Sequence, residues 1–149
     1  MAMFADLLRR LTAPEPQKLS DPDARLALGA LLVRIARSDG HYAAAEIQQI
    51  DCALAARYAL PATAAAALRA DCEVLEAEAP DTVRFTRAIK DAVGYDDRLA
   101  VIAAMWSVVL ADGLREEEED SLMRMISSLL GVSDQDSHKA RLRVIADRG

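Results

Sequence analysis

Apolar residues recur along this chain with the spacing of helices rather than of strands. Two segments, 26–37 and 99–111, are apolar on nearly all faces, which is typical of helices buried at the centre of a domain. No stretch alternates apolar and polar residues between turn signals, as a half-buried strand does. We therefore predict an all-α protein with seven to eight helices, arranged in two pseudo-symmetric helical halves around two buried central helices.

Residues that favour helix ends divide the chain further. Asp21 followed by Pro22 predicts a helix start with Asp21 as the N-cap, and Asp81 predicts a second start. Gly40 and Gly131 follow apolar segments at positions where helices commonly end in the left-handed conformation. In the predicted helix 115–130, the residues expected to face inward are Leu122, Met125, Ile126, Leu129 and Leu130.

The first 20 residues form a predicted segment of their own. Residues 1–11 read as an amphipathic helix, and residues 12–20 contain two prolines and read as a linker. The helix is either a docking or membrane-touching element or a cover for a groove of its own domain or of a neighbouring copy, and we favour the cover. The apolar face of the helix consists of Met3, Phe4, Leu7, Leu8 and Leu11. The domain itself is predicted to span residues 21–149.

Composition restricts the classes of partner. The chain has 149 residues and a net charge of −6, which disfavours nucleic acid and anionic membranes because both require clustered basic residues. Cys52 and Cys72 lack a C-x-x-C pattern and are predicted to be reduced core thiols. The apolar runs are shorter than the roughly 20 residues that cross a bilayer, and no signal peptide is recognisable. We expect a cytoplasmic protein.

The two central helices end in the same motif, D-G-x-x-x-x-x-E. Its carboxylates are Asp39 and Glu46 in the first copy and Asp112 and Glu119 in the second. A Glu near the start of the following helix leans back towards the turn, so each turn can present two carboxylates. If the halves are related by an approximate two-fold axis, all four side chains converge. Oxygen ligands of this kind suit a divalent cation such as Ca²⁺, Mg²⁺ or Mn²⁺.

Helix capping is the alternative explanation for these acids. A Glu at the third helical position often accepts a hydrogen bond from a backbone N–H as half of a capping box, whose other half is Ser or Thr. The corresponding residues are Ala43 and Glu116, so both copies lack the hydroxyl. The helix dipole nevertheless favours an early Glu by a few tenths of a kcal/mol. Capping and cation binding both remain open at this point.

Neither copy is an EF-hand. That calcium loop requires oxygen ligands four and two residues before the Asp. The residues at those places are Ile35 and Arg37 in the first copy, and Val108 and Leu110 in the second.

The repeated motif, the segment WSVVLADGLREEEED and the following LLGVSDQD resemble the tellurite-resistance TerB-like family. The resemblance extends from about Pro22 to the C-terminus. It implies an all-α fold of two pseudo-symmetric halves and an acidic cation site at Asp39, Glu46, Asp112 and Glu119. It also implies a non-enzymatic binding module in stress response or in membrane-associated assemblies. We therefore expect a protein partner, and a homo-oligomer remains open.

Two other functions compete with this hypothesis. The first is a metal-independent scaffold or adaptor that uses an apolar surface such as the face of residues 3–11. The second is a metal-assisted hydrolase, which we disfavour because His41 and His138 are isolated and no Glu-x-x-His pair or activated nucleophile is recognisable.

Overall fold

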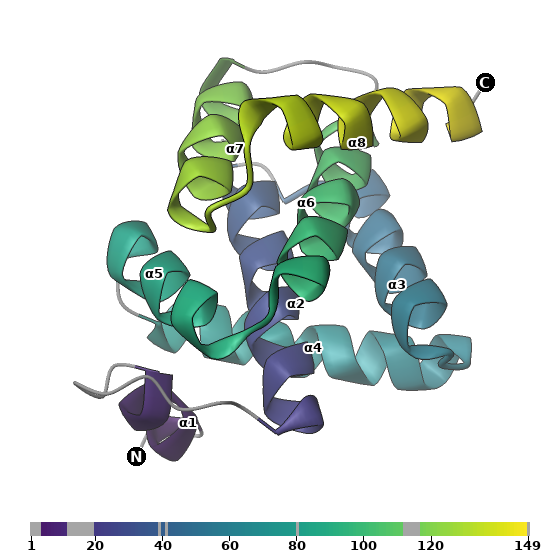
Figure 1. The fold of residues 1–149 in the computed structure, drawn as a ribbon. Coiled ribbons are helices and arrows are strands. Elements are labelled where there is room, and N and C mark those ends of the chain that lie inside the picture. The colour runs from purple at the N-terminus through teal and green to yellow at the C-terminus, as the bar shows by residue number, and fades with distance from the viewer. Residues whose placement is uncertain are drawn as a thin grey trace.

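A computed structural model shows a bundle of helices. It describes residues 4–11, 20–38, 40, 42–79, 81–111 and 117–148, of which Asp21, residues 117–120 and Arg148 are described for the backbone only. Every regular element in these ranges is helical, which confirms the all-α prediction (Figure 1). The helices are α1 (Ala5–Leu11), α2 (Asp21–Arg37), α3 (Ala44–Tyr58), α4 (Ala62–Glu78), α5 (Thr82–Ala92), α6 (Tyr95–Val109), α7 (Glu117–Leu129) and α8 (Asp134–Arg148).

Helices α2 and α6 form the centre of the bundle, as their apolar sequences predict. They contact each other, and α2 also contacts α3, α4, α5 and α7. In Figure 1 both helices run upwards, so their C-terminal ends lie at the same end of the molecule. The pseudo-symmetry of the two halves stays a prediction.

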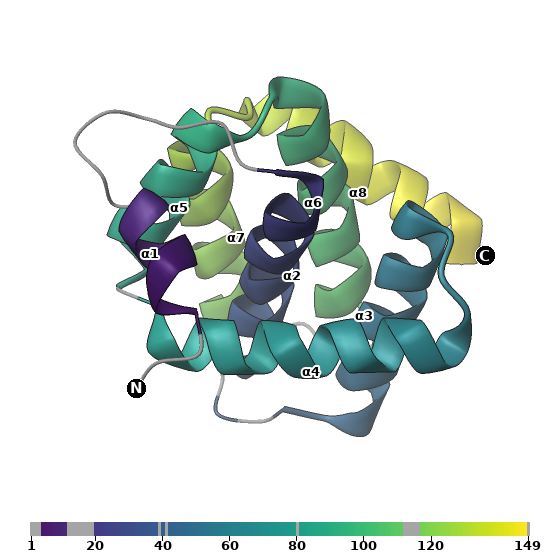
Figure 2. The same cartoon turned by 90° about the horizontal axis from the view of Figure 1, so that it is seen from below.

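The remaining helices cover this central pair. Helices α3 and α4 contact each other and α2, and α5 and α7 contact each other and α2. Figure 2 shows α4 extended across one face of the bundle. Helix α8 contacts α6 and α7, and its hydrogen bonds reach both Tyr95 and Trp106 of α6.

Helix α1 lies against its own chain. Leu7 and Leu11 are buried, α1 contacts α5, and the backbone N–H of Phe4 donates to Glu78 Oε2 at 3.2 Å. This is the covering role that we favoured for the segment. Met3 and residues 12–19 lie outside the described residues.

A close contact joins α2 to α4. Gly29 of α2 faces Cys72 of α4, and a Cβ at Gly29 would lie 2.3 Å from Cys72 Sγ. Cys72 is fully buried, and this burial raises the pKa of its thiol to about 12. Cys52, in contrast, is exposed, so the prediction of a core thiol is right for Cys72 and wrong for Cys52.

An ion-pair network also joins α2 to α4. Arg34 donates from Nε and Nη2 to Glu76 Oε2 at 3.2 and 3.0 Å, and Arg37 donates from Nη1 to Oε1 at 2.8 Å. The side chains of Arg34 and Glu76 are 14% and 13% exposed. Largely buried charges of this kind stabilise a fold only while all partners are present.

Most predicted helix ends are confirmed, and two details are corrected. The Asp81 side chain accepts from the Arg84 N–H at 3.0 Å, and Gly40 and Gly131 adopt positive φ angles of 81° and 73°. The N-cap of α2, however, is Ser20, and Asp21 is the first helical residue. In α7, Met123 is buried and Met125 is 38% exposed, because a predicted stripe can be shifted around the helix by the angle at which it packs.

Among the described residues, no helix is both long enough and apolar enough to cross a membrane.

Candidate functional site

The helix ends that flank the two Asp-Gly turns lie at one end of the molecule. The C-terminal ends of α2 and α6 and the N-terminal ends of α3 and α7 all lie near the top of Figure 1. Asp39 and Asp112 lie outside the described residues, and Glu119 belongs to α7 without a described side chain. Convergence of the four carboxylates therefore stays a prediction, and Glu46 is the member whose geometry is defined.

Glu46 is the third residue of α3, where the sequence places it. Its side chain is 2% exposed, and Oε1 accepts a hydrogen bond from the backbone N–H of Ala43, the N-cap, at 3.2 Å. Ala43 offers no side-chain oxygen in return, so only the Glu half of a capping box is present. Glu46 therefore caps α3, as the alternative explanation proposes, and places a carboxylate at the first turn.

The start of α3 is anchored to its neighbours near Glu46. The Arg37 guanidinium carbon lies 4.9 Å from the centre of the Tyr42 ring, and Arg37 is itself bound to Glu76 of α4. Burial raises the pKa of the Tyr42 hydroxyl, and the neighbouring Glu73 carboxylate raises it further. These contacts hold the end of α2 and the start of α3 against α4.

Within the described side chains, no three His, Cys, Asp or Glu residues gather as the ligands of a metal ion would. Glu46 is among these side chains, and the other three predicted ligands lie outside them.

An apolar cleft between α2, α3 and α6 is too small for a ligand. Its volume is about 40 Å³, close to the roughly 30 Å³ that one water molecule occupies. Leu28, Gly29, Leu54, Val101 and Ala104 contribute to its wall. Arg57 and Asp97, whose side chains are 44% and 51% exposed, also line it, so it is a small opening at the edge of the core.

A larger polar cleft lies between α6, α7 and α8. It encloses about 310 Å³, and its lining consists of Trp106, Arg124, Ser127, Asp134, Ser137, His138 and Arg141. Sequence analysis did not identify it, because its residues come from three helices. The only signal in the sequence is the polar face of α8, where positions 134, 137, 138 and 141 recur at helical spacing.

Comparison with known families gives a match over most of the chain. The model of the family described as "Tellurite resistance protein TerB" matches residues 25–142. Neither the curated proteins nor the solved structures that were compared contain a match.

Proposed function

The chain belongs to the TerB family, and from that premise we propose a helical module that binds a divalent cation at its two Asp-Gly turns. In this proposal the module carries out no reaction and acts by presenting its cation-bound form to a protein partner. The ligands are Asp39, Glu46, Asp112 and Glu119.

One structural observation supports the proposal more than any other. The described helix ends on both sides of both turns lie at the same end of the molecule in Figure 1, although the turns are far apart in the sequence. Helix ends that flank two copies of one acidic motif and lie at one end of a small domain favour a shared site over two unrelated caps. Ca²⁺, Mg²⁺ and Mn²⁺ are the matching ions, since they prefer carboxylate oxygens.

The geometry of Glu46 is compatible with a role as ligand. Glu46 Oε1 accepts from the Ala43 N–H, and carboxylates that ligate a metal ion are commonly hydrogen-bonded as well. The side chain is 2% exposed, so a cation bound there would be attracted more strongly than in bulk water.

The wider role that we propose is in a stress response. The family's description as a tellurite resistance protein supports this proposal, and TerB is not a known enzyme family. A cytoplasmic location, a membrane-associated assembly as the partner and self-association belong to this proposal as well.

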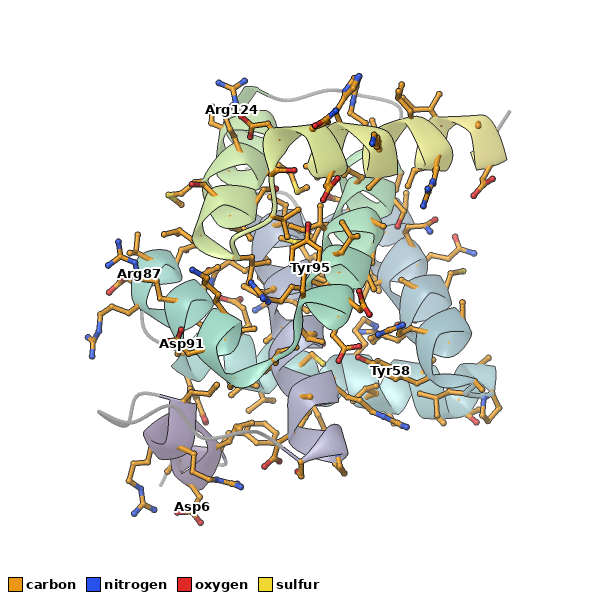
Figure 3. All side chains as sticks on the ribbon, viewed as in Figure 1. Asp6, Tyr58, Arg87, Asp91, Tyr95 and Arg124 are labelled. Carbon is orange, nitrogen blue, oxygen red and sulfur yellow. The ribbon has the colours of Figure 1, made fainter. Side chains whose placement is uncertain are left out.

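Titration of metal-free protein with Ca²⁺, Mg²⁺ and Mn²⁺ tests the proposal. We expect saturable heat in calorimetry and a higher unfolding temperature, because a ligand at a hundred times its Kd adds about 2.7 kcal/mol to stability. Asp39→Asn combined with Asp112→Asn should abolish both effects. The matched control is Asp6→Asn combined with Asp91→Asn, which removes equal charge from α1 and α5, away from the turns (Figure 3). Equal binding by the two double variants would reject the proposed site.

The scaffold function is the second candidate, and the cap formed by Glu46 favours it. Its surface cannot be the whole face of residues 3–11, because Leu7 and Leu11 are buried. The exposed apolar residues of α8, Leu142 and Ile145, are the alternative surface. Absence of cation binding up to millimolar concentrations, with folding intact, would favour this candidate.

A further inference from the structure

The cleft between α6, α7 and α8 combines features of a binding site for an oxyanion. Its described lining carries the side chains of Arg124 from α7 and of His138 and Arg141 from α8, against one carboxylate, that of Asp134. The two arginines alone outnumber that carboxylate. A cleft with a positive balance is unusual on a chain whose net charge is −6, so its charge is a local property of this site.

Arg141 is fixed over the wall of this cleft. Its guanidinium carbon lies 5.6 Å from the centre of the Trp106 ring, within the range of a cation–π contact. Its Nε is buried, and no acceptor in the described part of the chain bonds to it. A buried guanidinium donor normally has a partner, so this one favours an acceptor supplied from outside the chain.

Arg124 lies on the other side of the cleft, on α7. Figure 3 shows it on the turns of α7 beside the start of α8. The ion pairs found among the described residues include neither Arg124 nor Arg141. Two guanidinium groups that pair with no carboxylate among the described side chains, on neighbouring helices, can bind one multivalent anion together.

The floor of the cleft adds hydroxyl groups in fixed positions. Trp106 donates from Nε1 to Ser137 Oγ at 3.0 Å, and Ser137 Oγ lies 3.4 Å from Ser127 Oγ. Both serines are buried, at 6% and 1% exposed, and both line the cleft. Trp106 occupies an acceptor position of Ser137, and one serine hydroxyl donates to the other, so one hydroxyl hydrogen of the pair remains as a donor for an anion.

We propose that this cleft binds the phosphate group of a small phosphorylated metabolite. A phosphate has enough oxygens to accept from two arginines and a serine hydroxyl together, whereas a carboxylate has two. The volume of about 310 Å³ matches the lower range of small-molecule sites. Trp106 lies in the cleft wall beside the Arg141 guanidinium, so its fluorescence can report a bound ligand. This site and its ligand are independent of the cation proposal.

Fluorescence of Trp106, the only tryptophan, tests this proposal together with calorimetry. Three probes are titrated: inorganic phosphate, ribose 5-phosphate, and vesicles of equimolar phosphatidylcholine and phosphatidate. We expect saturable binding of the two free phosphates, with ribose 5-phosphate the tighter, and no preference for vesicles. Binding that occurs only with vesicles would overturn the proposed metabolite, and absence of binding up to tens of millimolar would overturn the site.

Variants of the two arginines locate the binding. Arg141→Gln and Arg124→Gln should each weaken binding of ribose 5-phosphate about tenfold or more, since each removes a charge-assisted contact. Arg141→Lys, which keeps the charge without the planar fork, should be intermediate. Arg87→Gln on α5 is the matched control and should leave affinity unchanged (Figure 3).

Arg124 is exposed, so Arg124→Gln should fold normally and keeps the test valid if Arg141→Gln does not fold. Wild-type affinity in a folded Arg124→Gln variant would contradict the proposal, as would equal losses in Arg87→Gln and Arg124→Gln.

Discussion

Gly29→Ala should destabilise the protein by about 2–3 kcal/mol, the upper range for overpacking a core. The added Cβ would lie 2.3 Å from Cys72 Sγ, well inside van der Waals contact. Both atoms lie where α2 packs on α4, so relief requires Cys72 to change its χ1 rotamer in a fully buried position or the helices to separate. Alanine is otherwise the better helix former by about 1 kcal/mol, and the loss must therefore exceed that gain. Chemical denaturation measures the change.

A double variant at the same contact provides the control. Gly29→Ala combined with Cys72→Ala removes the sulfur atom, and the next neighbours of the new Cβ lie at ordinary distances, 3.5 Å for Cys72 Cβ and 3.6 Å for Leu54 Cδ2. The double variant should therefore be more stable than Gly29→Ala alone, with a coupling energy of about 1–2 kcal/mol. Strictly additive effects of the two substitutions would show that α2 and α4 are not in this close contact.

Glu76→Ala should cost about 2–4 kcal/mol, somewhat below the 3–5 kcal/mol for breaking a fully buried pair, because some solvent reaches the network. The Glu76 carboxylate binds two arginines of α2, one through both Nε and Nη2. Its removal leaves the Arg34 guanidinium largely buried without its carboxylate. We expect the free energy of unfolding in urea to fall accordingly.

An exposed ion pair provides the comparison for Glu76→Ala. Arg57 of α3 pairs with Asp97 of α6, and their side chains are 44% and 51% exposed. Surface pairs of this kind contribute about 0–1 kcal/mol, so Arg57→Gln should have a small effect. If Glu76→Ala and Arg57→Gln had equal effects, the network between α2 and α4 would not have the energetic weight that its burial implies.

The fold was largely predictable because its signals are local. The apolar sequences of α2 and α6 identify them as central, and Asp81, Gly40 and Gly131 mark helix ends through their own backbone chemistry. Details that depend on neighbouring helices were not predictable. Which methionine of α7 faces the core, and whether Cys52 is covered, are decided by how the helices pack.

The two candidate sites also differ in whether the local sequence predicts them. The acidic turns are visible in sequence because each is a continuous motif that occurs twice. The cleft between α6, α7 and α8 is not visible in the sequence, because Trp106, Arg124 and Arg141 belong to three helices. Their spacing along the chain does not indicate that they line one cleft. The missing hydroxyl at Ala43 argues against a capping box, yet Glu46 still accepts a hydrogen bond from the Ala43 backbone N–H, because that bond does not require the reciprocal hydroxyl.

The stoichiometry of cation binding in variants of a single turn tests the central claim most directly. Calorimetry with Asp39→Asn and, separately, with Asp112→Asn asks whether the two turns form one site. We predict one cation per wild-type chain and at least tenfold weaker binding in each single variant, since each removes a charged ligand of the same ion. Two cations per chain, with each variant losing one of them and binding the other normally, would contradict the shared site.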